Sequence, residues 1–354
     1  MITLFERRST RKVKIGNIFI GGNEPIAVQS MLSKRSDDFD GSVAQAKQLE
    51  AAGCDIIRAA VPDMAAVKLI DKLKNNVSVP IVADIHFDYR LALECVSAGV
   101  DKIRINPGNI GSDDRVKAVA DSCAAAGVPI RIGVNSGSVE KEILAKYGSP
   151  TPQAMAESAM YHASLLEKFN FNNIVISIKS SNVQNTIAAY ETVASMCDYP
   201  LHLGVTEAGT KHMGIIKSAA GIGSLLAHGI GDTIRVSLTD EPVEEVKAGI
   251  DILKALNLRE NCVEIVSCPT CGRTRINMID IAGKVTELLA DCRKPIKVAV
   301  MGCAVNGPGE AREADIGIAG GDGCGLIFKK GEIIRKVSED KLVEELMSEI
   351  EKCN

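Results

Sequence analysis

Residues 80–108 read PIVADIHFDYRLALECVSAGVDKIRINPG, and they contain the unit from which most of the chain is built. The runs at 80–87 and 101–108 are rich in Ile and Val, as buried strands are. The segment between them has the apolar spacing of a helix and stops at Gly99, a common helix end. A strand, a helix and a second strand in this order predict neighbouring parallel strands.

The same unit recurs through the first two-thirds of the 354 residues. Helical segments such as 42–53, 89–99 and 242–256 alternate with apolar runs. Eight such units favour closure into a (β/α)8 barrel, and an open doubly wound sheet is the alternative. The expected strands are 25–31, 55–61, 80–87, 101–108, 129–137, 173–181, 200–209 and 232–240.

The remainder of the chain predicts a second, smaller α/β domain. Its expected strands are 263–269, 296–305, 315–321 and 324–331, and its expected helices are 277–292 and 338–352. A polar run at 257–261 marks the boundary. We therefore expect a barrel over residues 1–258 that binds the substrate, and a metal-binding domain over residues 259–354.

Composition narrows the class of protein. Apolar residues make up 46% of the chain and aromatic residues only 3%, so Ile, Val, Leu and Ala must form the core. A net charge of −4 gives no sign of a nucleic-acid or membrane binder. The N-terminal run MITLFERRSTRK has no apolar core of a signal peptide, and no run is long enough to cross a bilayer. We expect a cytoplasmic protein whose eleven cysteines stay reduced.

Charged and polar side chains crowd the predicted strand ends, where barrel enzymes carry their active sites. Several are spaced i, i+2, so they share one face of a strand. The cations among them predict a pocket for an anion with more than one phosphate, although any one arginine could instead form a salt bridge. The expected substrate-binding residues are Arg58, Asp84, His86, Arg104, Asn106, Arg131, Asn135, Lys179, Arg235 and Ser237.

Two residues suggest catalytic chemistry. Glu207 is the best candidate for a general acid, because a half-buried carboxylic acid can have a raised pKa; a partner for one of the arginines is the alternative. Lys179 at the end of an apolar strand is compatible with Schiff-base formation as well as with anion binding. Asp84 beside His86 favours a functional role for that histidine.

Two cysteine motifs lie in the predicted second domain. SCPTCGRT (267–274) supplies Cys268 and Cys271, and MGCAVNGPGE (301–310) supplies Cys303 and Glu310. Three thiolates on a cluster of four irons leave one iron for another ligand, as reduction of a bound substrate requires. Structural zinc is the alternative metal, and Cys324 is a rival for Glu310 as the fourth ligand.

Seven runs together resemble the bacterial type of 4-hydroxy-3-methylbut-2-enyl diphosphate synthase. The resemblance spans nearly the whole chain, and the two cysteine motifs are its most specific parts. One departure is the run Leu32–Arg35, where the family usually has a Thr-Asn-Thr-like sequence; here it adds positive charge near the expected barrel mouth. The runs are IGNIFIGGNEPIAVQSM (15–31), VADIHF (82–87), KIRINPGN (102–109), RIGVNSGS (131–138), HLGVTEAG (202–209), SCPTCGRT (267–274) and MGCAVNGPGEAREADIGIAGG (301–321).

The resemblance implies a barrel followed by an iron–sulfur domain, and a particular reaction. The substrate would be 2-C-methyl-D-erythritol 2,4-cyclodiphosphate, a precursor in isoprenoid biosynthesis by the non-mevalonate pathway. Two electrons would open its ring and remove a hydroxyl group as water, giving the linear allylic diphosphate. Ferredoxin or flavodoxin would supply the electrons, and the enzyme would be a homodimer.

The resemblance also assigns residues. It implies a 4Fe–4S cluster held by Cys268, Cys271, Cys303 and Glu310 rather than by Cys324, and a catalytic role for Glu310 as a ligand that yields its place to a substrate oxygen. Glu207 matches the family's proposed proton donor. Its substrate-binding positions map onto Arg58, Arg104, Arg131, Asn135 and Lys179, with Asp84 and His86 nearby.

Overall fold

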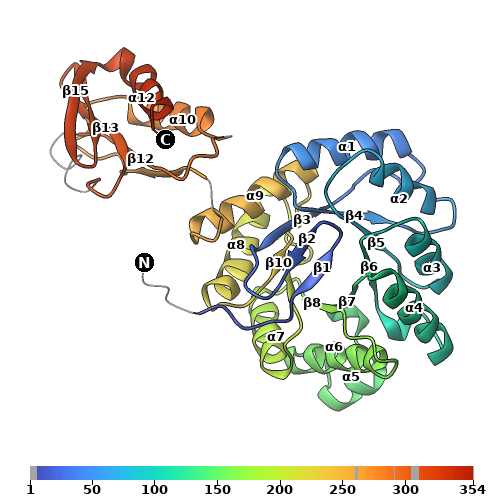
Figure 1. Ribbon diagram of the computed structural model, residues 1–354. Coiled ribbons are helices and arrows are strands. Elements are labelled where there is room, and N and C mark those ends of the chain that lie inside the picture. Colours follow the sequence, from blue (N-terminus) through green and yellow to red (C-terminus); the bar gives the residue numbers. More distant parts are fainter. Residues whose placement is uncertain (1–5, 260–261, 291, 304–310, 354) are drawn as a thin grey trace. The chain divides into compact units, whose positions relative to one another are not determined.

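The computed structural model describes residues 6–259, 262–290, 292–303 and 311–353. It divides into two compact units, Met1–Leu258 and Arg259–Asn354, each with its own sheet (Figure 1). No helix in the described ranges combines the length and the apolar character needed to cross a membrane.

The first unit is a barrel of parallel strands ringed by helices (Figure 1). Its sheet has eight strands in the order β8-β7-β6-β5-β4-β3-β10-β9, and a single bridge between Ile176 and Leu201 joins its two ends. This confirms the predicted barrel. The strands are β3 (Ala27–Met31), β4 (Ile56–Ala60), β5 (Ile81–Asp84), β6 (Lys102–Ile105), β7 (Ile130–Asn135), β8 (Ile174–Lys179), β9 (His202–Leu203) and β10 (Thr233–Ile234).

The last two strands are much shorter than the sequence predicts. Pairing in β9 stops before Gly204, where an added Cβ would lie 2.9 Å from the carbonyl oxygen of Arg235. The backbones of the segments that follow β9 and β10 approach closely at this glycine, and both segments are loops at the barrel mouth.

Helices follow the strands, with starts and stops encoded locally. Thr151 caps α6 by accepting a hydrogen bond from the Ala154 N–H, and Pro152 occupies the first turn. Gly127 ends α4 in the left-handed conformation, with φ of 68°. The helices are α1 (Phe39–Ala51), α2 (Val67–Lys74), α3 (Tyr89–Ser97), α4 (Asp113–Ala126), α5 (Lys141–Tyr147), α6 (Pro152–Glu167), α7 (Val183–Met196), α8 (Lys211–Ala227) and α9 (Pro242–Ala255).

Successive side chains of each barrel strand alternate between two environments, the apolar core under the helices and the interior of the barrel. Ile81 and Ala83 of β5, like Ile103 and Ile105 of β6, belong to the large apolar core between the sheet and the helices. The intervening residues point into the barrel, because successive side chains of a strand face opposite sides. The outer positions therefore stabilise the fold, while the inner positions are available for a site.

An N-terminal hairpin closes one end of the barrel, and the sequence analysis did not identify it. Strands β1 (Val13–Ile15) and β2 (Ile18–Ile20) pair antiparallel around a turn at Gly16, whose φ is 56°. Val13, Ile15 and Ile20 pack against the strand residues Ala27, Ile56, Val82 and Val175. These strand residues lie at or near the starts of β3, β4, β5 and β8. The hairpin therefore closes the N-terminal end of the barrel, opposite the C-terminal ends of the strands.

In its described residues, the second unit contains a mixed sheet and the helices α10 (Met278–Leu288) and α12 (Leu342–Glu351). Strands β11 (Glu264–Ser267), β12 (Lys297–Met301) and β13 (Ile316–Gly321) are parallel, and β14 (Cys324–Lys329) and β15 (Glu332–Ser338) continue antiparallel. Helices α10 and α12 pack on the same apolar core. Strand β15 was not predicted, because it is an edge strand without a buried residue and carries no apolar alternation.

We predict that Ile15→Ala lowers the free energy of unfolding of the barrel by about 2–5 kcal/mol, because it leaves a cavity in the plug. Lys14→Ala on the exposed face of the same strand should change it by less than about 0.5 kcal/mol. Urea unfolding followed by circular dichroism measures both. Equal small effects would show that the hairpin does not seal the barrel.

Candidate active site

Asp84 is the centre of a charged cluster at the C-terminal end of β5. Arg104 Nη1 lies 3.2 Å from its Oδ1, Arg58 Nη2 lies 3.4 Å from its Oδ2, and His86 Nε2 lies 3.6 Å from its Oδ2. Burial acts to raise the pKa of Asp84, but Arg58, His86 and Arg104 outweigh it and hold this pKa well below its ordinary value. Asp84 is therefore ionised and holds two arginines in the pocket.

Sheet register explains why these residues meet. Asp84 is paired with Arg104, and Arg104 is paired with Arg131 on the next strand. Laterally paired residues of a parallel sheet point to the same side, which here is the barrel interior. The prediction that these cations converge at the strand ends is consistent with this register.

Arg104 occupies space that a glycine leaves open. Its Nη2 donates to the Gly133 carbonyl oxygen at 3.1 Å, and a Cβ at Gly133 would lie 2.5 Å from its Nε. The Gly133 N–H donates to Asn106 Oδ1 at 2.9 Å. Asn106 and Arg104 are thus fixed against one residue of β7.

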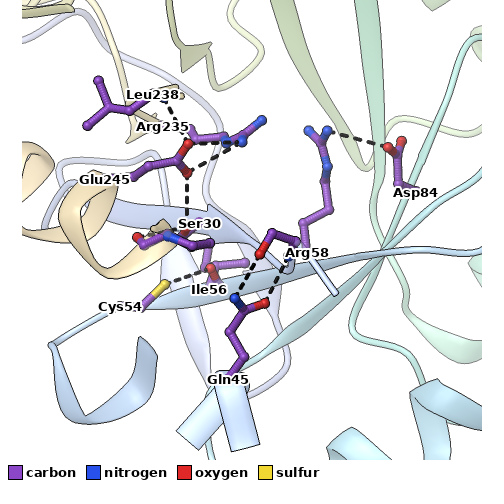
Figure 2. Close-up of polar contacts among 11 residues, drawn as sticks. Ser30, Gln45, Cys54, Ile56, Arg58, Asp84, Arg235, Leu238 and Glu245 are labelled. Carbon is purple, nitrogen blue, oxygen red and sulfur yellow. Dashed lines mark hydrogen bonds and ion pairs between the residues drawn. The ribbon is translucent and has the colours of Figure 1, made fainter. Parts of the chain in front are cut away.

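Arg235 has an acidic partner that the sequence analysis missed. Glu245 of α9 lies 3.4 Å from Arg235 Nη2 and accepts a hydrogen bond from the Ser30 hydroxyl at 3.1 Å (Figure 2). One of the predicted anion-binding cations, Arg235, is therefore paired with a carboxylate. Figure 2 also shows the Arg58 side chain reaching Asp84 on the neighbouring strand.

Lys179 and Arg131 are buried with few neutralising contacts. Arg131 Nη1 donates to the Ser177 hydroxyl at 3.2 Å, while its Nε and Nη2 are buried without a hydrogen-bond partner in the described residues. Burial and four neighbouring arginines lower the pKa of Lys179 well below its ordinary value. A lowered pKa favours the neutral amine, as the Schiff-base alternative requires, whereas a bound anion would favour the charged form.

A polar layer below these residues also escaped the sequence analysis. Gln29, Lys102 and His202 are each at most 1% exposed. Gln29 Oε1 and Nε2, Lys102 Nζ and His202 Nε2 have no hydrogen-bond partner among the residues that the structure describes. Lys102 was predictable in principle, because it lies two residues before Arg104 and so shares its inward face.

The pocket carries more positive than negative charge. Among the described residues, its acids are Asp84 and Glu245, and the buried donors of Arg58, Arg131 and Arg235 are only partly paired. Buried donors without acceptors are costly, so a bound group rich in acceptors would relieve them. The arrangement suits an anion with several oxygens. The basic residues involved are Arg58, Lys102, Arg104, Arg131, Lys179 and Arg235.

Other expected site residues sit at the mouth. Ser237 and Asn135 are half-buried, and Asn135 caps the short turn Ser136–Ser138. Glu207 is exposed rather than half-buried, because β9 ends four residues earlier. Its φ of 52° is uncommon for a residue with a side chain, and such backbone strain is concentrated at functional sites.

The run Leu32–Arg35 contributes less charge than expected. Leu32 is buried, and its N–H donates to the Arg58 carbonyl oxygen at 2.9 Å. Arg35 is exposed and pairs with Asp37 at 2.9 Å, so its charge is balanced locally.

In the second unit, the predicted thiol ligands follow two adjacent parallel strands. Cys268 and Cys271 come after β11, and Cys303 comes two residues after β12. The Gly302 N–H donates to Cys268 Sγ at 3.1 Å, which places this sulfur beside the residue preceding Cys303. Cys271 is exposed, and hydrogen bonds from the backbone and side chain of Arg273 lower its pKa.

These thiols form a donor set that suits a soft metal. Within the described residues, no three His, Cys, Asp or Glu side chains come close enough together to bind one metal ion. A backbone N–H directed at a sulfur, as from Gly302 to Cys268, is typical of sites where that sulfur binds metal. The predicted ligand Glu310 lies outside the described residues.

Comparison with known proteins settles the family. The GcpE TIM-barrel domain matches residues 10–250, and the GcpE protein C-terminal domain matches residues 264–352. This chain belongs to the GcpE family. GcpE relatives in Ruminiclostridium cellulolyticum and Clostridium perfringens are each 59% identical to it. Each match covers 98% of this chain, with 98% of the first relative and 99% of the second. Both are named 4-hydroxy-3-methylbut-2-en-1-yl diphosphate synthase (flavodoxin), which confirms the resemblance seen in the sequence.

Solved structures outside the GcpE family share the barrel alone. A dihydropteroate synthase from Stenotrophomonas maltophilia has a TM-score of 0.53 and 16% identity, and it covers 70% of this chain and 97% of its own. A type I 3-dehydroquinate dehydratase from Clostridium difficile has a TM-score of 0.51 and 15% identity. The match covers 70% of this chain and 98% of the dehydratase. At this identity the likeness concerns the fold and carries no activity to the GcpE chain.

We predict that Lys102→Met raises the free energy of unfolding at pH 7 by about 1–4 kcal/mol. Burial and the charges of Arg131 and Arg58 lower the pKa of Lys102, so the unfolded chain binds more protons than the folded one. Wild-type stability should then gain on the variant as pH rises towards the unfolded lysine pKa of about 10.4. Urea unfolding at pH 7 and pH 9.5 measures the gap, with exposed Lys68→Met as the pH-insensitive control. A variant less stable at both pH values would contradict this.

Proposed function

We propose that the protein reduces 2-C-methyl-D-erythritol 2,4-cyclodiphosphate to (E)-4-hydroxy-3-methylbut-2-enyl diphosphate. The observation that carries the proposal is the surplus of buried cationic donors at the barrel strand ends, in a chain of the GcpE family. The reaction consumes two electrons and two protons per substrate. The C2–O bond to the diphosphate breaks, the C3 hydroxyl leaves as water, and a C2–C3 double bond forms.

The basic residues hold the diphosphate. Arg58 and Arg104 are oriented by Asp84, so their free edges are preorganised for phosphate oxygens. Each charge-assisted hydrogen bond contributes about 1.5–3 kcal/mol. The same contacts stabilise the charge that develops as the C2–O bond breaks, because the diphosphate is both the anchor and the internal leaving group. Arg131, Lys179 and Arg235 complete the binding set.

The neutral residues orient the carbon skeleton. Asn106, held by the Gly133 N–H, and Asn135 supply amides for the substrate hydroxyls, and Ser237 supplies a hydroxyl. Glu207 donates the proton with which the C3 hydroxyl departs. Its exposed position and its left-handed backbone place this carboxyl on a mouth loop rather than in the barrel wall.

Cys268, Cys271 and Cys303, with Glu310, would hold a 4Fe–4S cluster. When bound, such a cluster supplies the two electrons one at a time and leaves one iron with an oxygen ligand. The donor hydrogen bond from Gly302 to Cys268 supports this assignment, because it orients a thiolate for metal binding.

The assembly and the electron donor follow from the same proposal. The relatives' names specify flavodoxin, so we assign flavodoxin rather than ferredoxin as the donor. The pocket and the thiols lie on different compact units, so turnover requires a hinge or a partner subunit; we assign a homodimer. We also assign the enzyme to the cytoplasm, because reduced thiols and an iron–sulfur cluster suit a reducing compartment.

We predict that the full chain, purified anaerobically, contains about four irons and four sulfides and converts the cyclodiphosphate in the presence of reduced flavodoxin. Cys303→Ala should lose the iron and the activity, whereas Cys324→Ala should keep both. Zinc in place of iron, or retention of iron in Cys303→Ala together with its loss in Cys324→Ala, would refute the assignment.

We also predict that Arg104→Ala weakens cyclodiphosphate binding by about tenfold to a hundredfold, since it removes charged donors from the pocket. The visible absorption of the cluster should not change. Titration calorimetry measures the affinity, and Arg115→Ala, an exposed arginine on α4, is the matched control. An unchanged affinity in Arg104→Ala would mean that the substrate binds elsewhere.

A further inference from the structure

His162 lies on α6, outside the pocket, yet it contacts two of the loops at the barrel mouth. Its side chain is 1% exposed. The Gly108 N–H donates to its Nδ1 at 3.2 Å, and Glu140 Oε1 lies 2.6 Å from its Nε2. Gly108 belongs to the loop after β6 and Glu140 to the loop after β7.

These contacts fix the state of the imidazole. A backbone N–H only donates, so Nδ1 must carry a lone pair. The proton of the neutral ring is then on Nε2, where it faces the Glu140 carboxylate. Burial is the largest influence on the pKa of Glu140 and acts to raise it, but contacts with His162, with Ser158 and with the backbone together outweigh burial and lower this pKa. The ring therefore lies between the loops: Nδ1 accepts a hydrogen bond from the first loop, and Nε2 faces the Glu140 carboxylate of the second as a close charge contact.

The fit between the ring and the first loop is tight. A Cβ at Gly108 would lie 2.8 Å from His162 Cε1, so the ring packs directly on the backbone of the turn Pro107–Asn109. A side chain at this position would push the loop away from α6. The glycine and the histidine are thus complementary.

Each loop continues from a residue assigned to the substrate. Asn106 caps the turn that contains Gly108, and its side chain is already bound to the Gly133 N–H. Asn135 caps the turn Ser136–Ser138, and Glu140 follows as the cap of α5. One imidazole therefore contacts both of the loops that begin at Asn106 and Asn135.

We propose that His162 is a positioning residue for substrate binding, which acts through Gly108 and Glu140 to hold Asn106 and Asn135 in register. This role rests on the proposed function, because it assumes that both amides bind the cyclodiphosphate. The histidine does not touch the substrate. Its loss should loosen both loops together while the rest of the barrel stays ordered.

The test uses three variants of the full, anaerobically purified chain. His162→Asn keeps an acceptor near the position of Nδ1, His162→Gln keeps a donor near Nε2, and His162→Ala keeps neither. We expect His162→Ala to weaken cyclodiphosphate binding about tenfold and to speed amide exchange at 106–110 and 135–140 by a similar factor. His162→Asn should restore slow exchange in the first loop only, and His162→Gln in the second only.

The control is His228→Asn. This exposed histidine lies at the C-terminal end of α8, and its replacement should change neither the affinity nor the loop exchange. If His162→Ala does not fold, Glu140→Ala breaks the bridge from the other side. Unchanged loop exchange, or faster loop exchange with unaltered affinity, would overturn the proposal. Failure of the wild-type chain to bind cyclodiphosphate would instead refute the proposed function and leave the exchange result standing.

Discussion

Unbalanced positive charge inside the barrel is the constraint on which the rest of the structure depends. Asp84 and Glu245 orient three arginines, but they leave buried donors of Arg58, Arg131 and Arg235 without acceptors in the described residues. Such donors lower the stability of the empty fold. The apolar core outside the sheet must offset this cost, and an anion with several oxygens removes it. The same positive charges that destabilise the barrel on its own make it selective for anions.

Side chains alternate along each barrel strand, so the outward ones stabilise the fold and the inward ones form the site. Outward residues such as Ile81 and Ile103 pack under the helices, while their inward neighbours Asp84 and Arg104 meet in register. The hairpin at 13–20 closes the far end with apolar side chains, so the polar layer opens only towards the strand ends. At the mouth, Gly133 and Gly108 make room for Arg104 and His162.

Much of this was predictable, because periodicity and position carry the information. Eight alternating units predicted the barrel. The alternation of side chains along a strand puts Arg58, Asp84 and Arg104 on inward faces. The three-residue strands of the hairpin are too short for any periodic signal, and β15 has no buried residue. Glu245 and His162 lie on helices, so their contacts with the barrel arise only from tertiary packing. Glu207 was placed wrongly because nothing in its local sequence reveals that β9 ends at Leu203.

The most direct test of the account is a crystal structure of the full chain with bound cyclodiphosphate. The account predicts phosphate oxygens within hydrogen-bond distance, about 2.7–3.2 Å, of Arg104, Lys179 and Arg235 inside the barrel mouth. A cyclodiphosphate bound outside the barrel, with only water on those three side chains, would contradict it.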